Sequence, residues 1–493
     1  MRHIELPAVS GVHRRRSLDW SMVNHHGGRR VGGSNGRGNT IWTASMTSAD
    51  QPFDTSVPAV VLKLTPNVRH HGGLGVIRSL GRSGITVYGV HETPRAPVAS
   101  SRYLAGRFFW QPDPSSVADI TAGLTRIAER IGRPAVLLPT DDAGALYLAE
   151  HGDDLRPWFL FPAPPPGLPR RVAGKHSLYE MCRELGMPSP EVCLPDSPGA
   201  ARQFADGVGY PLIAKLTTPW MSGGALPTTS VVHDADGLND ISGRCADSGV
   251  GLILQEFIPG GRDHDWFFHG YCDSESVCHP AFTGVKERSF PVGAGSTTYG
   301  RSVANENLRD WATAFLKRIH YCGIMDLDVR LDARNGQYHL LDFNPRLGAQ
   351  FRIFRDTAGT DVALAAYLDL TGQAIPPGEQ VNERRFMVEN YDPRSGLAHW
   401  RRGDLSLRAW LSSVLAVDEF AWFAYDDLWP FGLICLRMTW KAVTWPVTGA
   451  RQPAAALPAG AASIRYRSGR AKARTHPTTG ARQRVRREVG ERL

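Results

Sequence analysis

The chain has 493 residues, 42% of them hydrophobic and 21% charged, which is typical of a globular protein with about two to four domains. No apolar run approaches the ~18 residues of a membrane-spanning helix, and the seven cysteines include no Cys-x-x-Cys pair. The composition therefore argues against a membrane-spanning protein, a disulfide framework and a cysteine-rich zinc site. It favours a reduced, cytoplasmic setting.

The net charge of +8 is carried by the two ends of the chain. Residues 465–493 hold ten Lys and Arg against two Glu, and residues 1–50 hold seven Arg against three acids, so the middle of the chain is mildly acidic. Basic segments that cannot bury apolar surface are usually disordered. We therefore expect disordered basic termini over 1–55 and 448–493, and no specific nucleic-acid partner.

From residue 58 onward, apolar strands alternate with amphipathic helices. The expected elements are a strand at 58–64, a helix to Leu80, a strand at 85–90, a helix over 117–131 and a strand at 135–138. This alternation predicts a parallel sheet covered on both faces, so residues 58–165 are interpreted as an α/β lobe.

A glycine-rich segment, His71-Gly-Gly-Leu-Gly75, follows the first expected strand. It is expected to be a tight strand-to-helix turn. The alternative is a dinucleotide-binding fingerprint, which Gly73-Leu-Gly75-Val-Ile-Arg78 disfavours because the third glycine is absent.

The proline-rich run 162–169 marks the first domain boundary. The pattern of apolar residues over 171–375 is then typical of an α+β domain. The expected elements are helices over 175–185 and 305–321 and strands at 210–216 and 251–257. A second Pro/Gly break at 375–378 precedes an aromatic-rich C-terminal subdomain over 380–447. The sequence thus predicts an α/β N-terminal lobe followed by an α+β domain.

The most informative segment, 323–346, is predicted to form two strands joined by a turn that contains Asn335-Gly336. Because side chains alternate along a strand, Asp326 and Asp328 share one face of the first strand, and Asp342 and Asn344 share one face of the second. Two carboxylates and an amide oxygen on neighbouring strands suit Mg²⁺. The alternative is the exposed polar face of an amphipathic hairpin.

The turn alone leaves the register of this hairpin open. A loop over 332–336 puts Asp326 across from Asp342, whereas a loop over 333–337 puts Asp328 there.

Two lysines add to the pattern. Lys175 opens a helix and Lys215 ends an apolar strand, where phosphate is a common partner, although each alone could be a surface lysine. The loop 221–225 contains glycines whose backbone could cover phosphates, and the loop 286–295 supplies cations. The strand that runs into 254–263 has backbone groups that could bind adenine.

In this order, the features resemble the ATP-grasp superfamily, most closely its carboxylate–amine ligase branch, over about residues 58–375. The likeness rests on Lys175, Lys215, Gln255-Glu-Phe-Ile258, Asp328 and Asp342-Phe-Asn-Pro-Arg346. It implies an ATP-grasp domain over 171–375, preceded by a lobe that helps bind the acceptor. The spacing of the two metal-binding acids in the family favours Asp328 as the partner of Asp342.

The resemblance also implies roles for single residues. It assigns the ATP phosphates to Lys175 and Lys215, the adenine to Glu256, Phe257 and Ile258, the ribose to Asp263, Mg²⁺ (or Mn²⁺) to Asp328, Asp342 and Asn344, and the phosphoryl group and substrate carboxylate to Arg288 and Arg346. The family usually has Glu at position 342, and often at 328, so the carboxylates of this chain are one methylene shorter.

The implied function is that of a cytoplasmic, ATP- and Mg²⁺-dependent ligase, which joins a small carboxylate to an amine through an acyl phosphate. Two alternatives are a non-catalytic ATP-binding regulatory module and an NAD-dependent oxidoreductase built on the first lobe. The tryptophan-rich segment and basic tail could contact an anionic membrane surface, or the tryptophans could pack on the ATP-binding domain. The sequence leaves the oligomeric state open.

Overall fold

A computed structural model of the chain describes residues 53–113, 116–217, 226, 228–261, 263–293 and 295–448, with no side-chain description beyond 440. The basic tail, nearly all of the N-terminal extension and the loop 221–225 lie outside the described residues. Among the described residues, no helix is both long and apolar enough to span a membrane.

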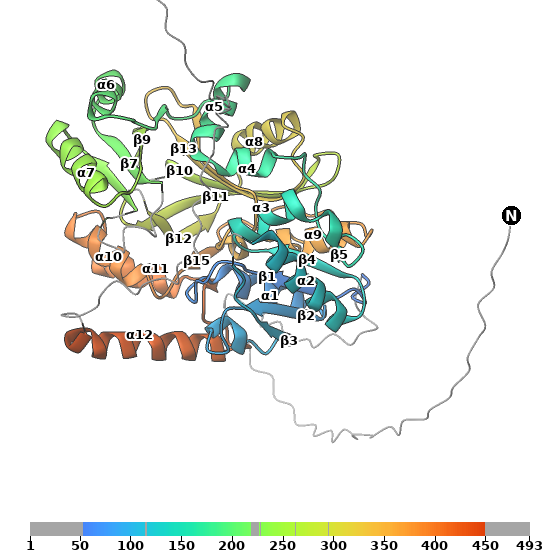
Figure 1. Cartoon of the computed structure of the whole chain (residues 1–493). Helices are drawn as coiled ribbons and strands as arrows, with labels where there is room; N and C mark the ends of the chain where they lie inside the picture. Colours follow the sequence, from blue (N-terminus) through green and yellow to red (C-terminus); the bar gives the residue numbers. More distant parts are fainter. Residues whose placement is uncertain are drawn as a thin grey trace, which may run out of the picture. The chain divides into compact units, whose positions relative to one another are not determined.

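The first lobe contains a five-stranded parallel sheet (Figure 1). In spatial order its strands are β3 (Leu104–Phe109), β2 (Val87–His91), β1 (Ala59–Leu62), β4 (Ala135–Pro139) and β5 (Phe159–Leu160). Its helices are α1 (Gly72–Arg82), α2 (Val117–Ile131) and α3 (Asp142–His151). The chain runs outward from β1 to β3 and returns on the other side of β1 as β4. The carboxyl ends of β1 and β4 therefore form a topological switch point, where α/β sheets commonly bind ligands.

The glycine-rich segment does not form the predicted turn, because α1 already begins at Gly72. A Cβ atom at Gly75 would lie 2.7 Å from Arg352 Cδ and 2.8 Å from the ring of Phe351. The glycines thus let α1 pack closely against the short 3-10 helix η4 (Phe351–Ile353).

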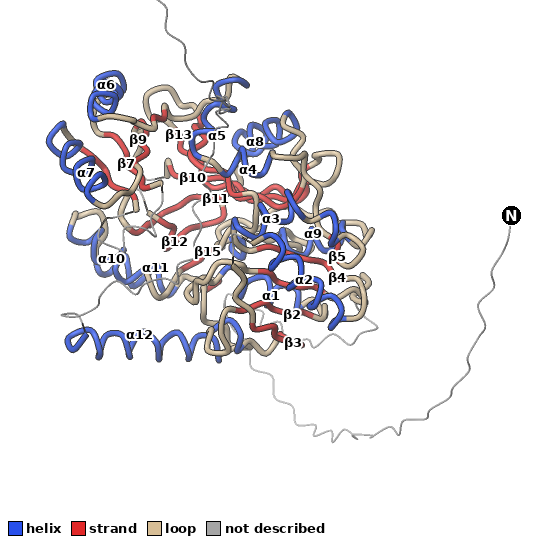
Figure 2. The backbone as a smooth tube through the Cα atoms, viewed as in Figure 1, coloured by secondary structure: helices blue, strands red, loops and turns tan. Residues whose placement is uncertain are grey.

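Two further sheets follow the connecting helices α4 (Leu168–Ala173) and α5 (Lys175–Leu185). The four-stranded sheet has the order β6 (Val192–Cys193), β9 (Leu252–Glu256), β7 (Leu212–Leu216) and β8 (Thr229–Val232). Helices α6 (Pro198–Val208) and α7 (Ala235–Asp247) share a hydrophobic core with this sheet and lie beside it in Figure 2.

The seven-stranded sheet is antiparallel except at its last pair. Its order is β14 (Tyr338–Asn344), β13 (Gly323–Leu331), β10 (Asp265–Cys272), β11 (Cys278–Phe290), β12 (Ser296–Ser302), β15 (Arg385–Met387) and β16 (Glu419–Phe420). Helices α5 and α8 (Glu306–Arg318) cover one part of it, and α9 (Val362–Leu370) joins it to the core of the first lobe. Met325, Leu327 and Val329 are buried in the core with α8, as the alternation in β13 predicted.

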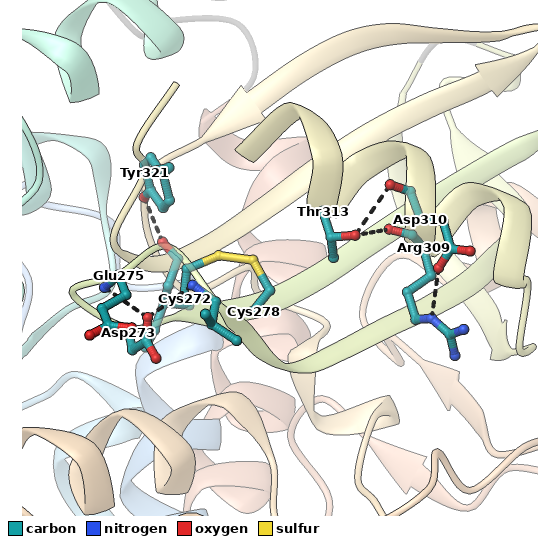
Figure 3. The surroundings of a disulfide bond; sticks show 10 residues. Cys272, Asp273, Glu275, Cys278, Arg309, Asp310, Thr313 and Tyr321 are labelled. Carbon is teal, nitrogen blue, oxygen red and sulfur yellow. Dashed lines mark hydrogen bonds and ion pairs between the residues drawn. A yellow bond between two sulfur atoms is a disulfide. The ribbon is translucent and has the colours of Figure 1, made fainter. Parts of the chain in front are cut away.

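A disulfide joins Cys272 and Cys278, which pair across β10 and β11 (Figure 3). The sequence argued against a disulfide framework, and among the described residues this one bridge joins two cysteines only six positions apart. The Asp273 carboxylate shapes the hairpin by accepting hydrogen bonds from the backbone N–H groups of Glu275 and Val277, both at 2.9 Å. This turn brings the two cysteines together.

The C-terminal region consists of α10 (Asp392–Arg401), α11 (Leu407–Leu415), β16 and α12 (Trp429–Thr448). Two of its tryptophans pack on the body of the protein: Trp422 is buried and donates to Asn390 Oδ1, and Trp410 Nε1 donates to Asp392. The side chains of Trp400, Trp429 and Trp440 are 56%, 72% and 70% exposed. The tryptophans thus divide between packed and exposed positions.

A fully buried ion pair holds this region to the first lobe. Arg78 Nε lies 3.0 Å from Asp427 Oδ2, and Asp427 also accepts hydrogen bonds from the Ser101 hydroxyl and the Arg102 N–H. We expect Asp427→Ala to lower the free energy of unfolding by about 3–5 kcal/mol in urea denaturation, because it leaves a buried guanidinium unpaired. Arg82→Gln breaks a neighbouring, more exposed ion pair with Asp426, and it should lower the free energy of unfolding by no more than about 1 kcal/mol. Similar losses for the two variants would contradict this account.

Candidate active site

The predicted hairpin places its acids as the family spacing indicated. Asp328 pairs with Asp342, and Asp326 pairs with Asn344. Next to the turn the strands pair in a register shifted by one residue, with Val329 opposite Leu340. A β-bulge between Leu340 and Asp342 shifts the pairing back, so that Asp328 lies opposite Asp342. Both hairpin registers considered from the sequence assume regular pairing, so neither predicts the bulge that brings Asp328 opposite Asp342.

Three lysines from separate elements surround these two aspartates. Lys175, at the first position of α5, forms an ion pair with Asp342, and Lys286 Nζ lies 3.1 Å from Asp328 Oδ1. Lys215, on β7 of the other sheet, donates to Gln255 Oε1 at 2.7 Å. Lys286 belongs to β11, so the loop predicted over 286–295 is wrong for its first five residues.

The charges of this group act on one another. Burial lowers the pKa of Lys215 to about 8, and the positive charge of Lys175 adds to the effect. Burial alone would raise the pKa of Asp342, but the two lysines outweigh it and lower that pKa. Burial raises the pKa of Asp328, and Asp326 and Asp342 reinforce this rise against Lys286. The site thus concentrates cations around buried carboxylates.

Arg346 links this group to the first lobe. Its Nε donates to Asp142 Oδ1 of α3 at 2.9 Å, and its Nη2 donates to Asn344 Oδ1 at 3.0 Å. Its Nη1 lies 3.8 Å from Asp326 Oδ2, while the other oxygen of Asp326 lies 3.1 Å from His269 Nε2. Sequence reasoning missed His269, because its place beside Asp326 depends on the pairing of β10 with β13.

Comparison with curated proteins finds a sequence relative. Over 232 residues the chain is 25% identical to D-aspartate ligase of Enterococcus faecium (strain Aus0004), a match that covers 43% of this chain and 53% of that protein. The chain thus spans about half the length of this relative. No family model matches the chain. The match agrees with the resemblance read from the ordered lysines and aspartates.

Comparison with solved structures also gives matches. N5-carboxyaminoimidazole synthetase from Staphylococcus aureus matches with a TM-score of 0.49 and 11% identity, over 68% of this chain and 82% of that one. Biotin carboxylase from Campylobacter jejuni, in a β,γ-ATP complex, matches with a TM-score of 0.47 and 16% identity, over 66% and 74%.

The segment that the ATP-grasp resemblance assigns to adenine is held by arginines. Arg330 donates from Nε to the carbonyl oxygen of Ile258 at 2.6 Å, and its guanidinium lies 5.4 Å from the centroid of the Phe257 ring. Glu256 Oε1 accepts from Arg334 Nη2 at 2.8 Å. Asp263, the residue assigned to ribose, is exposed with a φ of 68° in the turn before β10. Within the described residues, no contact joins it to the lysines.

Arg288 has a different setting from the one expected. Its Nε and Nη2 donate to the two oxygens of Asp392 at 2.8 and 2.9 Å, and its Nη1 donates to Ser413 Oγ at 2.9 Å. Its guanidinium also lies 3.9 Å from the centroid of the Tyr299 ring. In the part of the chain that the structure describes, no contact joins Arg288 to Asp328 or Asp342, and its catalytic role stays a prediction.

The donor set predicted for magnesium consists of oxygen atoms on the hairpin of β13 and β14. Among the described residues, no group of three or more His, Cys, Asp or Glu side chains is arranged to hold a metal ion. The predicted set needs only the carboxylates of Asp328 and Asp342 with the amide oxygen of Asn344. The described ion pairs with Lys286 and Lys175 each use one oxygen of a carboxylate, and Asn344 Oδ1 accepts a hydrogen bond from Arg346. Hard oxygen donors of this kind suit Mg²⁺.

Proposed function

We propose that this chain is an ATP- and Mg²⁺-dependent ligase that joins a small carboxylate to an amine. The carboxylate would attack the γ-phosphate of ATP to give an acyl phosphate and ADP, and the amine would then displace phosphate to form an amide. The observation that supports this best is the arrangement of Lys175, Lys215 and Lys286 around Asp328 and Asp342.

Each side chain has a task in this proposal. The three lysines bind phosphate oxygens, and Arg346 orients the substrate carboxylate beside the phosphoryl group. Asp328, Asp342 and Asn344 would hold Mg²⁺, which when bound supplies charge neutralisation to the phosphates. The contribution of the chain is thus positioning and electrostatic stabilisation.

The relative's name suggests a substrate, D-aspartate or a similar small acidic amino acid. The test is to incubate purified protein with ATP, Mg²⁺, D-aspartate and a panel of amines, and to follow ADP, phosphate and the amide. We expect release of ADP and phosphate that depends on both substrates and stops with EDTA. Absence of turnover with every acid–amine pair would contradict the ligase function.

A second candidate is a non-catalytic ATP-binding regulatory module, which the shortened carboxylates at positions 328 and 342 favour. Tight ATP binding without hydrolysis in every substrate mixture would select it. The NAD-dependent alternative requires a thermal shift with NAD and none with ATP. Cytoplasmic location and contact of the basic tail with anionic membranes stay predictions, and liposome sedimentation with and without the tail tests the latter.

The low pKa of Lys215 gives the proposed ATP site a pH dependence. The pKa, lowered by burial to about 8, means that Lys215 is protonated below pH 7 and loses its charge as the pH rises through 8. Lys286 stays charged, because Asp328 and Asp265 raise its pKa against the effect of burial. We expect ATP affinity, measured by calorimetry, to fall about tenfold between pH 7 and pH 9.5, since one charge-assisted contact is lost.

Lys215→Arg is the control, because arginine keeps its charge over this range. Its ATP affinity should vary little with pH. An equal fall in both proteins would assign the pH dependence to another group.

A further inference from the structure

The exposed apolar side chains of this protein are concentrated in its C-terminal region. Nineteen large apolar side chains are exposed among the described residues, and eleven of them lie between Leu397 and Met438. This segment comprises α10, α11, β16 and the first half of α12, which are drawn in orange and red in Figure 1. Single exposed apolar residues are ordinary on a protein surface, whereas many in one region indicate a surface that binds a partner.

Helix α11 is amphipathic, but none of its residues is buried. Leu407, Leu411 and Leu415 are spaced four residues apart, which places them on one face, and they are between 49% and 88% exposed. Trp410 and Ser413, on another face of the helix, hold it to the body of the protein by hydrogen bonds. The three leucines therefore form an apolar stripe on the solvent side of α11.

Helix α12 presents a second stripe. Its inner face packs on the first lobe through Ile434, which is buried in the core of that lobe. Trp429 and Leu436 are seven residues apart, so they share the opposite face, and both are exposed. Tryptophan is enriched where membranes meet water, because its ring is apolar and its N–H group is polar. An amphipathic helix of this kind can lie in the plane of the lipid headgroups.

The charges near these stripes are mostly positive. Over residues 392–415 the exposed charged side chains are Arg394, Arg401, Arg402 and Arg408, against Asp404 alone. After Leu428 the sequence contains twelve Lys and Arg residues before its next acidic residue, Glu488. A second copy of the chain would bring like charges together on this surface, whereas an anionic bilayer complements the cations and also covers the apolar stripes.

We propose that the C-terminal region binds the surface of an anionic lipid bilayer. The stripes of α11 and α12 lie among the headgroups, and the surrounding arginines contact lipid phosphates. Burial of the apolar side chains supplies affinity for any bilayer, and the cations supply the preference for anionic lipid. The stripes belong to other elements than the lysines and aspartates of the candidate active site, so the inference does not depend on the ligase function.

The test is co-sedimentation of the full chain with phosphatidylcholine vesicles and with mixed phosphatidylcholine–phosphatidylglycerol vesicles. We expect at least tenfold tighter binding to the mixed vesicles, and a loss of this preference at high salt. Leu411→Gln/Leu415→Gln and Trp429→Gln/Leu436→Gln should each lower the affinity for mixed vesicles about tenfold or more, because each removes two inserted side chains. Both variants should keep the wild-type affinity for ATP.

The matched control is Leu194→Gln/Val277→Gln, which changes two similarly exposed residues outside the C-terminal region and should bind vesicles like the wild type. Glutamine is compatible with helices, and thermal unfolding checks that each variant folds. Equal binding to both kinds of vesicle, or binding to neither, overturns the proposal. Wild-type binding by both helix variants also overturns it, because the basic tail alone would then be responsible. A dimer without lipid that the helix variants dissociate, seen by sedimentation velocity, would overturn it in favour of a second copy on this surface.

Discussion

Asp342→Ala should lower the kcat for ATP-dependent phosphate release by about 10³-fold while leaving the fold intact. Asp342 stands opposite Asp328 in the hairpin and pairs with Lys175 at the start of α5. In the proposed mechanism it holds the metal ion and fixes a phosphate-binding lysine, so its removal disturbs two groups that act in the transition state. The substitution should therefore lower kcat far more than it lowers the stability of the fold.

Steady-state phosphate release measures this effect, with thermal unfolding as the check on folding. Asp310→Ala, an exposed position on α8, is the matched control and should keep wild-type activity. A folded Asp342→Ala enzyme that retained a tenth or more of the wild-type rate would show that this carboxylate does not hold the catalytic metal.

Local signals in the sequence were sufficient for several elements. Helix α2 has the predicted bounds, because the Ser116 side chain caps its first turn and Gly132 ends it with a left-handed φ of 72°. Helix α5 also has its predicted bounds, and Gly186 ends it in the same way. The face that Asp326 and Asp328 share followed from strand alternation alone. These features depend only on residues a few positions apart.

The partners across the large sheet could not be predicted, because they depend on the order β14-β13-β10-β11. Lys286 reaches Asp328 across an intervening strand, and Asp326 meets His269 on that strand. Arg288 was predicted from a loop that is in fact the end of β11, where α10 and α11 supply its partners. No spacing in the sequence encodes such non-local pairing.

The register of the hairpin gives the last prediction, a ranking of two neighbouring acids. Asp328→Asn should lower kcat about 10²-fold, because it removes a carboxylate charge directly opposite Asp342 and the partner of Lys286. Asp326→Asn should lower kcat by about tenfold or less, because Asp326 pairs with His269 and approaches Arg346, which makes it a positioning group for the substrate carboxylate.

The two variants should also differ in kind, which separates a metal ligand from a positioning residue. Asp326→Asn should raise the KM for the carboxylate substrate through Arg346, whereas Asp328→Asn should raise the Mg²⁺ concentration that gives half-maximal activity. The reverse ranking would mean that Asp326 rather than Asp328 faces the metal. Equal, mild effects would argue against a metal site on this hairpin, since loss of a ligating carboxylate in a buried cationic site cannot be neutral for phosphoryl transfer.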